Sequence, residues 1–217
     1  MVIIKALTRL FIVLLFCFGG LTCQSGTESK RRESELVLTL DTELGTVHCT
    51  LFNQRVPRTV AHIKGLADGT IAFRDYRSGL KRRGHYYDGL KFFRRIPGVM
   101  VQTGCPIGDG TGHPGFRIEA EVHDDDTKLL QEPGTLVMAR YHPAKNRIDP
   151  DPPLPGKVIG SQFSIMLRAS THLAGQTPVI GRCRDLEVIR RLSLATQAPI
   201  LKRLRVTPID LGHPHPS

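Results

Sequence analysis

The sequence predicts a mainly β domain in which many short strands form a closed barrel with helices at its ends. Three observations favour this fold. Apolar and polar residues alternate with a period of two in several short stretches, as they do in half-buried strands. The 15 prolines and 21 glycines among 217 residues provide many turns. Helical spacing is confined to one early and one late stretch, so we expect two helices.

The first 23 residues have the layout of a secretory signal peptide. Lys5 and Arg9 precede an apolar run over residues 10–18, and small residues follow. That run is shorter than the roughly 20 residues that a bilayer span needs. Cys23 stands where bacterial lipoprotein signals carry their lipidated cysteine, so we expect lipidation there, plain cleavage or an uncleaved anchor. The predicted location is exported, either periplasmic or membrane-anchored.

A polar linker over residues 24–34 separates this segment from the predicted domain over residues 35–210. The domain opens on a hairpin, because residues 36–41 and 46–51 both alternate around a turn. The period then changes to that of a helix at Val56, Val60, Ile63 and Ala67. Pro57 near its start and Gly69 just past its end are typical helix boundaries.

The middle of the chain alternates strand candidates with loops. Residues 74–85 hold five Arg or Lys against one Asp, which predicts a basic loop. Asp185 predicts the N-cap of the late helix. Residues 140–158 hold five prolines and predict a loop or insert, and residues 211–217 a loose tail. Further strands are predicted at residues 90–95, 99–103, 135–139, 163–167 and 203–206.

Composition excludes several classes of protein. Hydrophobic residues make up 40% and charged residues 23% of the chain, which is near average for a globular protein and argues against disorder or a multi-pass membrane protein. The net charge is +10, and removal of Lys5 and Arg9 with the signal leaves +8. Aromatic residues amount to only 6%, with no Trp, so nucleic-acid binding by base stacking is not expected.

Export permits disulfides. Beyond the signal, Cys49, Cys105 and Cys183 allow at most one intramolecular pair. No CxxC, HExxH or GxSxG motif is present, so neither a metal site nor a hydrolase is predicted. The acidic run over residues 124–126 lacks the spacing of a calcium cage and predicts a solvated turn.

Residues 86–115 carry the most specific signal, YYDGLKFFRRIPGVMVQTGCPIGDGTGHPG. This stretch resembles the cyclophilin-type peptidyl-prolyl cis–trans isomerases, whose motif runs YxGxxFHRxIPxFMxQGGD and then GTGGxG. Their second motif, GSQFFI, corresponds to GSQFSI at residues 160–165. The resemblance covers about residues 36–209. It implies an eight-stranded antiparallel barrel capped by two helices, acting as a monomer, without a cofactor, on proline-containing segments of unfolded or exported proteins.

Isomerisation of a prolyl bond needs no nucleophile, metal or proton relay. The barrier of about 18–20 kcal/mol comes from amide resonance, so a catalyst must grip the proline and stabilise the twisted amide, for example with a fixed cation. The resemblance assigns that role to Arg94. It assigns hydrogen bonds with the substrate backbone to Gln102 and to the main chain near Ala139 and Arg140. Gln162 would support the pocket, and Met100 and Leu173 would line its apolar part.

Several positions depart from the family pattern. A fully buried Phe contributes roughly 1.5–3 kcal/mol, so the loss of two aromatic walls predicts weak or altered isomerase activity. A further hypothesis is that Arg140, where Asn is usual, and the basic loop select acidic or extended substrates. The altered pocket positions are Val99 and Ser164 in place of Phe, His172 before Leu173, and Thr177 in place of His; Phe93 also replaces the His before Arg94.

Two functions follow from these residues. The first is an isomerase that assists the folding of exported proteins, which the retained Arg94, Met100 and Gln102 favour. The second is a catalytically degenerate domain that binds peptides, which the altered pocket favours. A dinucleotide site at residues 110–115, which fit GxGxxG, is not predicted, because the strand-like residues 116–120 follow where such a site needs a helix.

Overall fold

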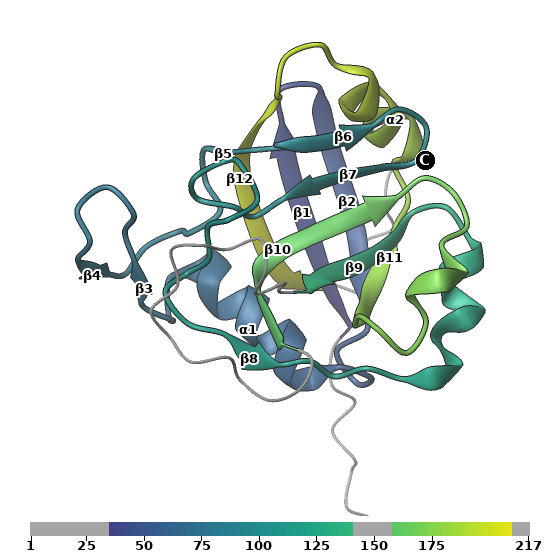
Figure 1. The fold of residues 1–217 in the computed structure, drawn as a ribbon, viewed down its shortest axis with the longest axis horizontal. Coiled ribbons are helices and arrows are strands. Elements are labelled where there is room, and N and C mark those ends of the chain that lie inside the picture. The colour runs from purple at the N-terminus through teal and green to yellow at the C-terminus, as the bar shows by residue number, and fades with distance from the viewer. Residues whose placement is uncertain (1–34, 141–157, 210–217) are drawn as a thin grey trace, which may run out of the picture. The chain divides into compact units, whose positions relative to one another are not determined.

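One curled antiparallel sheet dominates the fold in the computed structural model (Figure 1). The structure describes residues 35–140 and 158–209. The predicted signal with Cys23, the linker, residues 141–157 of the proline-rich insert and the tail lie outside these ranges. The strands of the sheet are β1 (Leu36–Thr42), β2 (Gly45–Leu51), β5 (Leu90–Lys91), β6 (Arg94–Ile96), β7 (Met100–Thr103), β8 (Ile118–Glu119), β9 (Thr135–Arg140), β10 (Val158–Met166), β11 (Val179–Cys183) and β12 (Ile200–Pro208).

The sheet does not close, so the expected closed eight-stranded barrel is wrong in this respect. Its order is β5-β12-β1-β2-β11-β9-β10-β7-β6, with β8 beside β10, and within the described residues no ladder joins β5 to β6. These two edge strands are consecutive in the sequence, separated only by Phe92 and Phe93. A hydrogen bond from Thr103 Oγ1 of β7 to the carbonyl of Lys91 in β5, at 3.0 Å, links the two ends of the sheet.

The predicted opening hairpin is confirmed. Strands β1 and β2 pair in the register Leu38↔Cys49 and Leu40↔Val47, and all four side chains are fully buried. Gly45 begins β2 with a φ of 129°, a backbone conformation that glycine adopts without strain. The alternation seen in the sequence therefore places one face of the hairpin in the core.

Two helices cover opposite ends of the curl, as expected (Figure 1). Helix α1 (Pro57–Asp68) starts on its proline and ends where Gly69 adopts the left-handed conformation. Its apolar face buries Val60 and Ile63 next to strand β12. Helix α2 (Leu186–Leu194) buries Ile189 and Leu192. The sequence thus predicted both helices from period and boundary residues.

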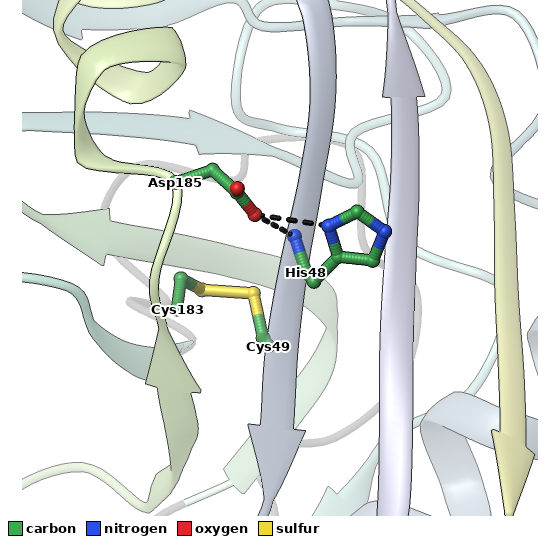
Figure 2. Close-up of a disulfide and its surroundings, with 4 residues drawn as sticks. All are labelled: His48, Cys49, Cys183 and Asp185. Atoms are coloured by element: carbon green, nitrogen blue, oxygen red, sulfur yellow. Dashed lines mark hydrogen bonds and ion pairs between the residues drawn. A yellow bond between two sulfur atoms is a disulfide. The ribbon is translucent and has the colours of Figure 1, made fainter. Parts of the chain in front are cut away.

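Asp185 precedes α2, but its carboxylate does not cap the helix as predicted. It accepts hydrogen bonds instead from the backbone N–H of His48, at 2.7 Å, and from the His48 ring, at 3.0 Å (Figure 2). The neighbouring residue pair, Cys49 and Cys183, forms a disulfide between paired positions of β2 and β11. Disulfide and carboxylate together fasten the start of α2 to β2, and Cys105 remains a buried free thiol.

Three further predictions need correction. The basic loop contains a hairpin, formed by β3 (Phe73–Arg74) and β4 (Lys81–Arg82). The strand predicted at residues 90–95 is broken into β5 and β6. The acidic run is not simply solvated, because Asp126 is fully buried and accepts hydrogen bonds from Arg55, with its Nε 3.0 Å away. The run lies in a short 3-10 helix, η1 (Asp124–Thr127), which η2 (Leu129–Gln131) follows.

Strand β10 separates two apolar clusters and so positions the site. Phe163 and Ile165 belong to the main cluster inside the curl. Met166, one residue further, belongs to a second cluster that also contains Met100 and Val137. Because successive side chains of a strand point to opposite faces, the residues with even numbers from Gln162 to Met166 share the face away from the main core.

Candidate functional site

A pocket of about 640 Å³ lies on this second face of the sheet. Strands β6, β7, β9 and β10 supply much of it, and the segments over residues 109–113 and 168–177 complete it. The structure brings together every pocket residue predicted from the sequence. These are Arg94, Val99, Met100, Gln102, Ala139, Arg140, Gln162, Ser164, His172, Leu173 and Thr177.

The strand register sets Arg94 beside Gln102 and Ser164. Arg94 of β6 pairs with Gln102 of β7, and Gln102 pairs with Ser164 of β10. Directly opposite residues in antiparallel strands have Cβ atoms about 4.5–5.5 Å apart on the same face. Arg94 is exposed, and none of the bonds among the described residues involves its guanidinium. The cation is therefore free to meet a ligand in the pocket.

The floor beside this row is apolar. Met100 and Met166 pair across β7 and β10 and are 6% and 5% exposed. Val137 of β9 is 2% exposed, and Val99 and Leu173 pack against the same cluster. Sequence reasoning missed Val137 and Met166, although the alternation that places Ser164 in the pocket also places Met166 there.

Gln162 holds the polar wall of the pocket. Its side-chain N–H₂ donates to the carbonyl oxygens of Gly110 and Gly112, at 3.0 and 2.8 Å. Its Oε1 accepts a hydrogen bond from Gln102 Nε2 at 3.0 Å. Gln102 thereby presents its own carbonyl oxygen, which can accept a hydrogen bond from a backbone N–H of a bound peptide.

Cys105 organises the loop that forms this wall. Its buried Sγ accepts the backbone N–H groups of Gly108, Gly110 and Gly112 at 3.2–3.3 Å. The family motif QGGD has Asp where this chain has Cys105, so a sulfur atom is the acceptor at this position here. The segment that fits GxGxxG is therefore a pocket wall that leads into β8, as predicted, rather than a dinucleotide loop.

Two buried tyrosines hold the backbone of β10 at Ser161, next to the end of β7. Tyr86 Oη lies 2.8 Å from Ser161 Oγ, and Tyr87 Oη donates to the Ser161 carbonyl at 3.1 Å. Burial raises the pKa of both phenols well above the ordinary value, so both stay neutral donors. Gly104 is required there, because a Cβ atom on it would lie 2.3 Å from the Ser161 oxygen.

The altered positions lie around the apolar floor of the pocket. Ser164 is 5% exposed and Thr177 is 3% exposed. The Thr177 hydroxyl donates its hydrogen bond to the Met138 carbonyl, so this hydrogen is not available to a ligand. His172 is exposed on the short 3-10 helix η4 (Thr171–Leu173). No aromatic ring stands at positions 99, 164 or 177, which leaves this side of the pocket open.

Within residues 35–140 and 158–209, no group of three or more His, Cys, Asp or Glu side chains gathers as a metal site requires. No helix in those ranges has the length and apolar character to cross a membrane.

Comparisons with known proteins agree with this geometry. A family model described as cyclophilin type peptidyl-prolyl cis-trans isomerase/CLD matches residues 37–207. A probable peptidyl-prolyl cis-trans isomerase A of Mycobacterium bovis is 33% identical over 165 residues, which cover 76% of this chain and 81% of that protein. A peptidyl-prolyl cis-trans isomerase of Synechococcus elongatus is 36% identical over 157 residues, covering 70% and 86% respectively.

Solved structures show the same fold. A cyclophilin type peptidyl-prolyl cis-trans isomerase of Cryptosporidium parvum superposes with a TM-score of 0.61 at 21% identity, covering 81% of this chain and 99% of that one. The same protein in the presence of the dipeptide Ala-Pro gives a TM-score of 0.60. The family model over residues 37–207, together with the relatives at 33% and 36% identity, shows that the chain belongs to the cyclophilin-type peptidyl-prolyl cis–trans isomerase family.

Proposed function

We propose that this protein isomerises X–Pro bonds in exported proteins, with an activity weakened or altered by its open pocket. The observation that carries the proposal is the strand row of Arg94 and Gln102 beside the floor of Met100, Val137 and Met166. One pocket thus combines a cation, a hydrogen-bond acceptor and an apolar surface. These are the groups that a catalyst needs to hold a proline and stabilise its twisted amide.

The chemistry follows from these groups. The proline ring packs on the apolar floor, and Gln102 accepts an N–H of the peptide backbone. Twisting the prolyl amide breaks its resonance and concentrates an electron pair on the nitrogen. The Arg94 guanidinium donates a hydrogen bond to this nitrogen and stabilises the twisted form more than either planar form. Each 1.36 kcal/mol of such differential stabilisation raises the rate about tenfold.

The open side of the pocket supports the altered activity. A proline that contacts fewer pocket walls is held less firmly. The entropy cost of orienting its amide is then not met by binding and adds to the barrier of the reaction. Val99, Ser164 and Thr177 stand where the family has larger rings, and the Thr177 hydroxyl is bonded to the backbone. We expect the deficit in KM more than in kcat, because the row that carries Arg94 is intact.

Export and anchoring belong to the same proposal. The Cys49–Cys183 disulfide supports an oxidising compartment, since such bonds are rare in reducing ones. Cys23 is the proposed lipidation site, which would hold the domain at a membrane surface. Mass spectrometry of the mature N-terminus tests this: a diacyl-modified Cys23 supports anchoring, and an N-terminus beyond residue 23 contradicts it.

The catalytic proposal is tested by initial-rate isomerisation of an Ala-Pro peptide with wild type, Arg94→Ala and Arg184→Ala. Arg184 is an exposed arginine outside the pocket lining, so it controls for loss of one surface charge. We expect Arg94→Ala to lower kcat/KM at least tenfold and Arg184→Ala to match wild type. Equal rates for Arg94→Ala and wild type would rule out Arg94 as the catalyst. A wild type no faster than the uncatalysed reaction would favour the alternative function, a domain that binds peptides without isomerising them.

A further inference from the structure

The pocket that holds the proposed isomerase site is lined by three arginines from three different segments. Arg94 comes from β6, Arg140 from the end of β9, and Arg168 from the segment after β10. Arg94 and Arg168 are exposed and Arg140 is half-buried. No ion pair within the described part of the chain involves any of the three. An arginine stays charged at all relevant pH values, so their charges are available to a ligand.

The one carboxylate in the described pocket lining, Asp109, does not offset these charges at close range. Asp109 Oδ1 accepts hydrogen bonds from the Thr111 hydroxyl and N–H, at 2.7 and 2.8 Å. The first of these bonds is the largest cause that lowers the pKa of Asp109, which keeps it ionised but committed to its own loop. The lining therefore carries a surplus of positive charge.

Strand register for Arg140 and Arg94, and chain order for Arg168, place the three arginines one after another along the direction of β10. Arg140 pairs with Ile159 near the start of β10. Arg94 lies across β7 from Ser164, near the other end of β10, and Arg168 follows two residues after Met166. The five steps along the strand from Ile159 to Ser164 span about 16 Å at roughly 3.3 Å each. Arg94 therefore lies between two outer cations, Arg140 and Arg168.

A second group of cations adjoins the Arg140 end. The β3–β4 hairpin is fixed to the pocket wall, because Tyr76 Oη accepts the N–H of His113 at 3.1 Å and Arg74 N–H donates to the Pro114 carbonyl at 2.9 Å. His113 lines the pocket beside Gly160. The hairpin exposes Arg77 and Lys81, whose side chains have no ion-pair partner among the described residues.

From this arrangement we propose that the site selects proline-containing segments with acidic residues on both sides of the proline. The inference rests on the proposed function for its site and adds the chemical class of substrate. Arg94 meets the prolyl unit, while Arg140 and Arg168 lie within a few extended residues of it on either side and attract carboxylates there. Exposed ion pairs are individually weak, so the selectivity is the sum of several.

The test uses the purified full-length protein and three nine-residue peptides with a central Ala-Pro, flanked on each side by two Glu, two Gln or two Lys. We expect kcat/KM to fall from Glu to Gln to Lys, with roughly a tenfold span in low salt. The span should shrink to about twofold in 1 M salt, where the Debye length is about 3 Å. The comparison between low and high salt uses only the wild-type protein, so its result does not depend on whether a variant folds.

Variants assign the effect to residues. Arg140→Gln together with Arg168→Gln should reduce the Glu-to-Lys ratio to about twofold, while Arg184→Gln, outside the pocket, should leave the ratio unchanged. Equal rates on the three peptides by an active wild type would overturn the inference and leave the proposed function standing. An inactive wild type would overturn the proposed function. In that case the dissociation constants of the same peptides decide: ranking by charge supports the inference, and equal constants overturn it.

Discussion

The two sides of the pocket are built by different means. The polar wall is held by buried, directional bonds, with Gln162 and Cys105 fixing the carbonyl and N–H groups of the loop over residues 105–112. The apolar side has short side chains, Val99 and Ser164, where the family has rings. Under the proposed function, the parts that orient the reacting amide are retained and the parts that grip the proline are reduced, so binding and catalysis should separate under mutation.

The largest effect should come from breaking the polar wall. Gln162→Ala removes two bonds to the loop and one to Gln102, each worth about 1 kcal/mol net. We expect kcat/KM to fall roughly ten- to hundredfold. Steady-state isomerisation kinetics measure this, with Gln131→Ala, an exposed glutamine outside the pocket, as the matched control. A Gln162→Ala protein with wild-type kinetics would show that the wall does not orient the substrate.

A smaller effect, of opposite sign, should come from rebuilding the grip. Ser164→Phe restores a ring next to Met100 and Met166, and a buried Phe contributes roughly 1.5–3 kcal/mol. We expect KM for an Ala-Pro peptide to fall several-fold with little change in kcat. Ser170→Phe, a buried serine that also lines the pocket but lies off the strand row, controls for added bulk. An unchanged or raised KM for Ser164→Phe would mean that the grip is supplied elsewhere.

The smallest effect concerns the support behind the polar wall. His62 of α1 lies 2.9 Å from the Gly160 carbonyl through Nε2, and burial is the largest cause that lowers its pKa below 6.5. Between its folded pKa and 6.5 the unfolded chain binds more protons, so the free energy of unfolding rises with pH, by at most about 1.4 kcal/mol per pH unit.

Urea unfolding at a series of pH values from 5 to 7.5 measures this slope. His62→Gln should flatten it, and His172→Gln, at an exposed histidine, should leave it unchanged. The same slope in wild type and His62→Gln would assign the pH dependence to other groups.

Sequence alone predicted the elements whose signal is local. The hairpin of β1 and β2 and the helix α1 follow from period and from Pro57 and Gly69. The pocket residues were found through the family resemblance, which places residues such as Arg94, Gln102 and Gln162 on its motifs and the remaining ones by their position along the matched chain. The features that the sequence did not predict depend on contacts between distant segments. One is the open edge between β5 and β6. The other is the burial of Asp126, which bonds to Arg55, 71 positions earlier in the chain. Arg168 lies on no motif, and it joins the pocket through the segment that follows β10.

The central claim is that Arg94 lowers the barrier of the bound prolyl bond. Exchange NMR of an Ala-Pro peptide, at equal fractions bound to wild type and to Arg94→Ala, measures isomerisation on the protein independently of affinity. The predicted result is cis–trans exchange at least tenfold faster on wild type than on Arg94→Ala. Equal exchange rates on the two proteins would contradict the claim.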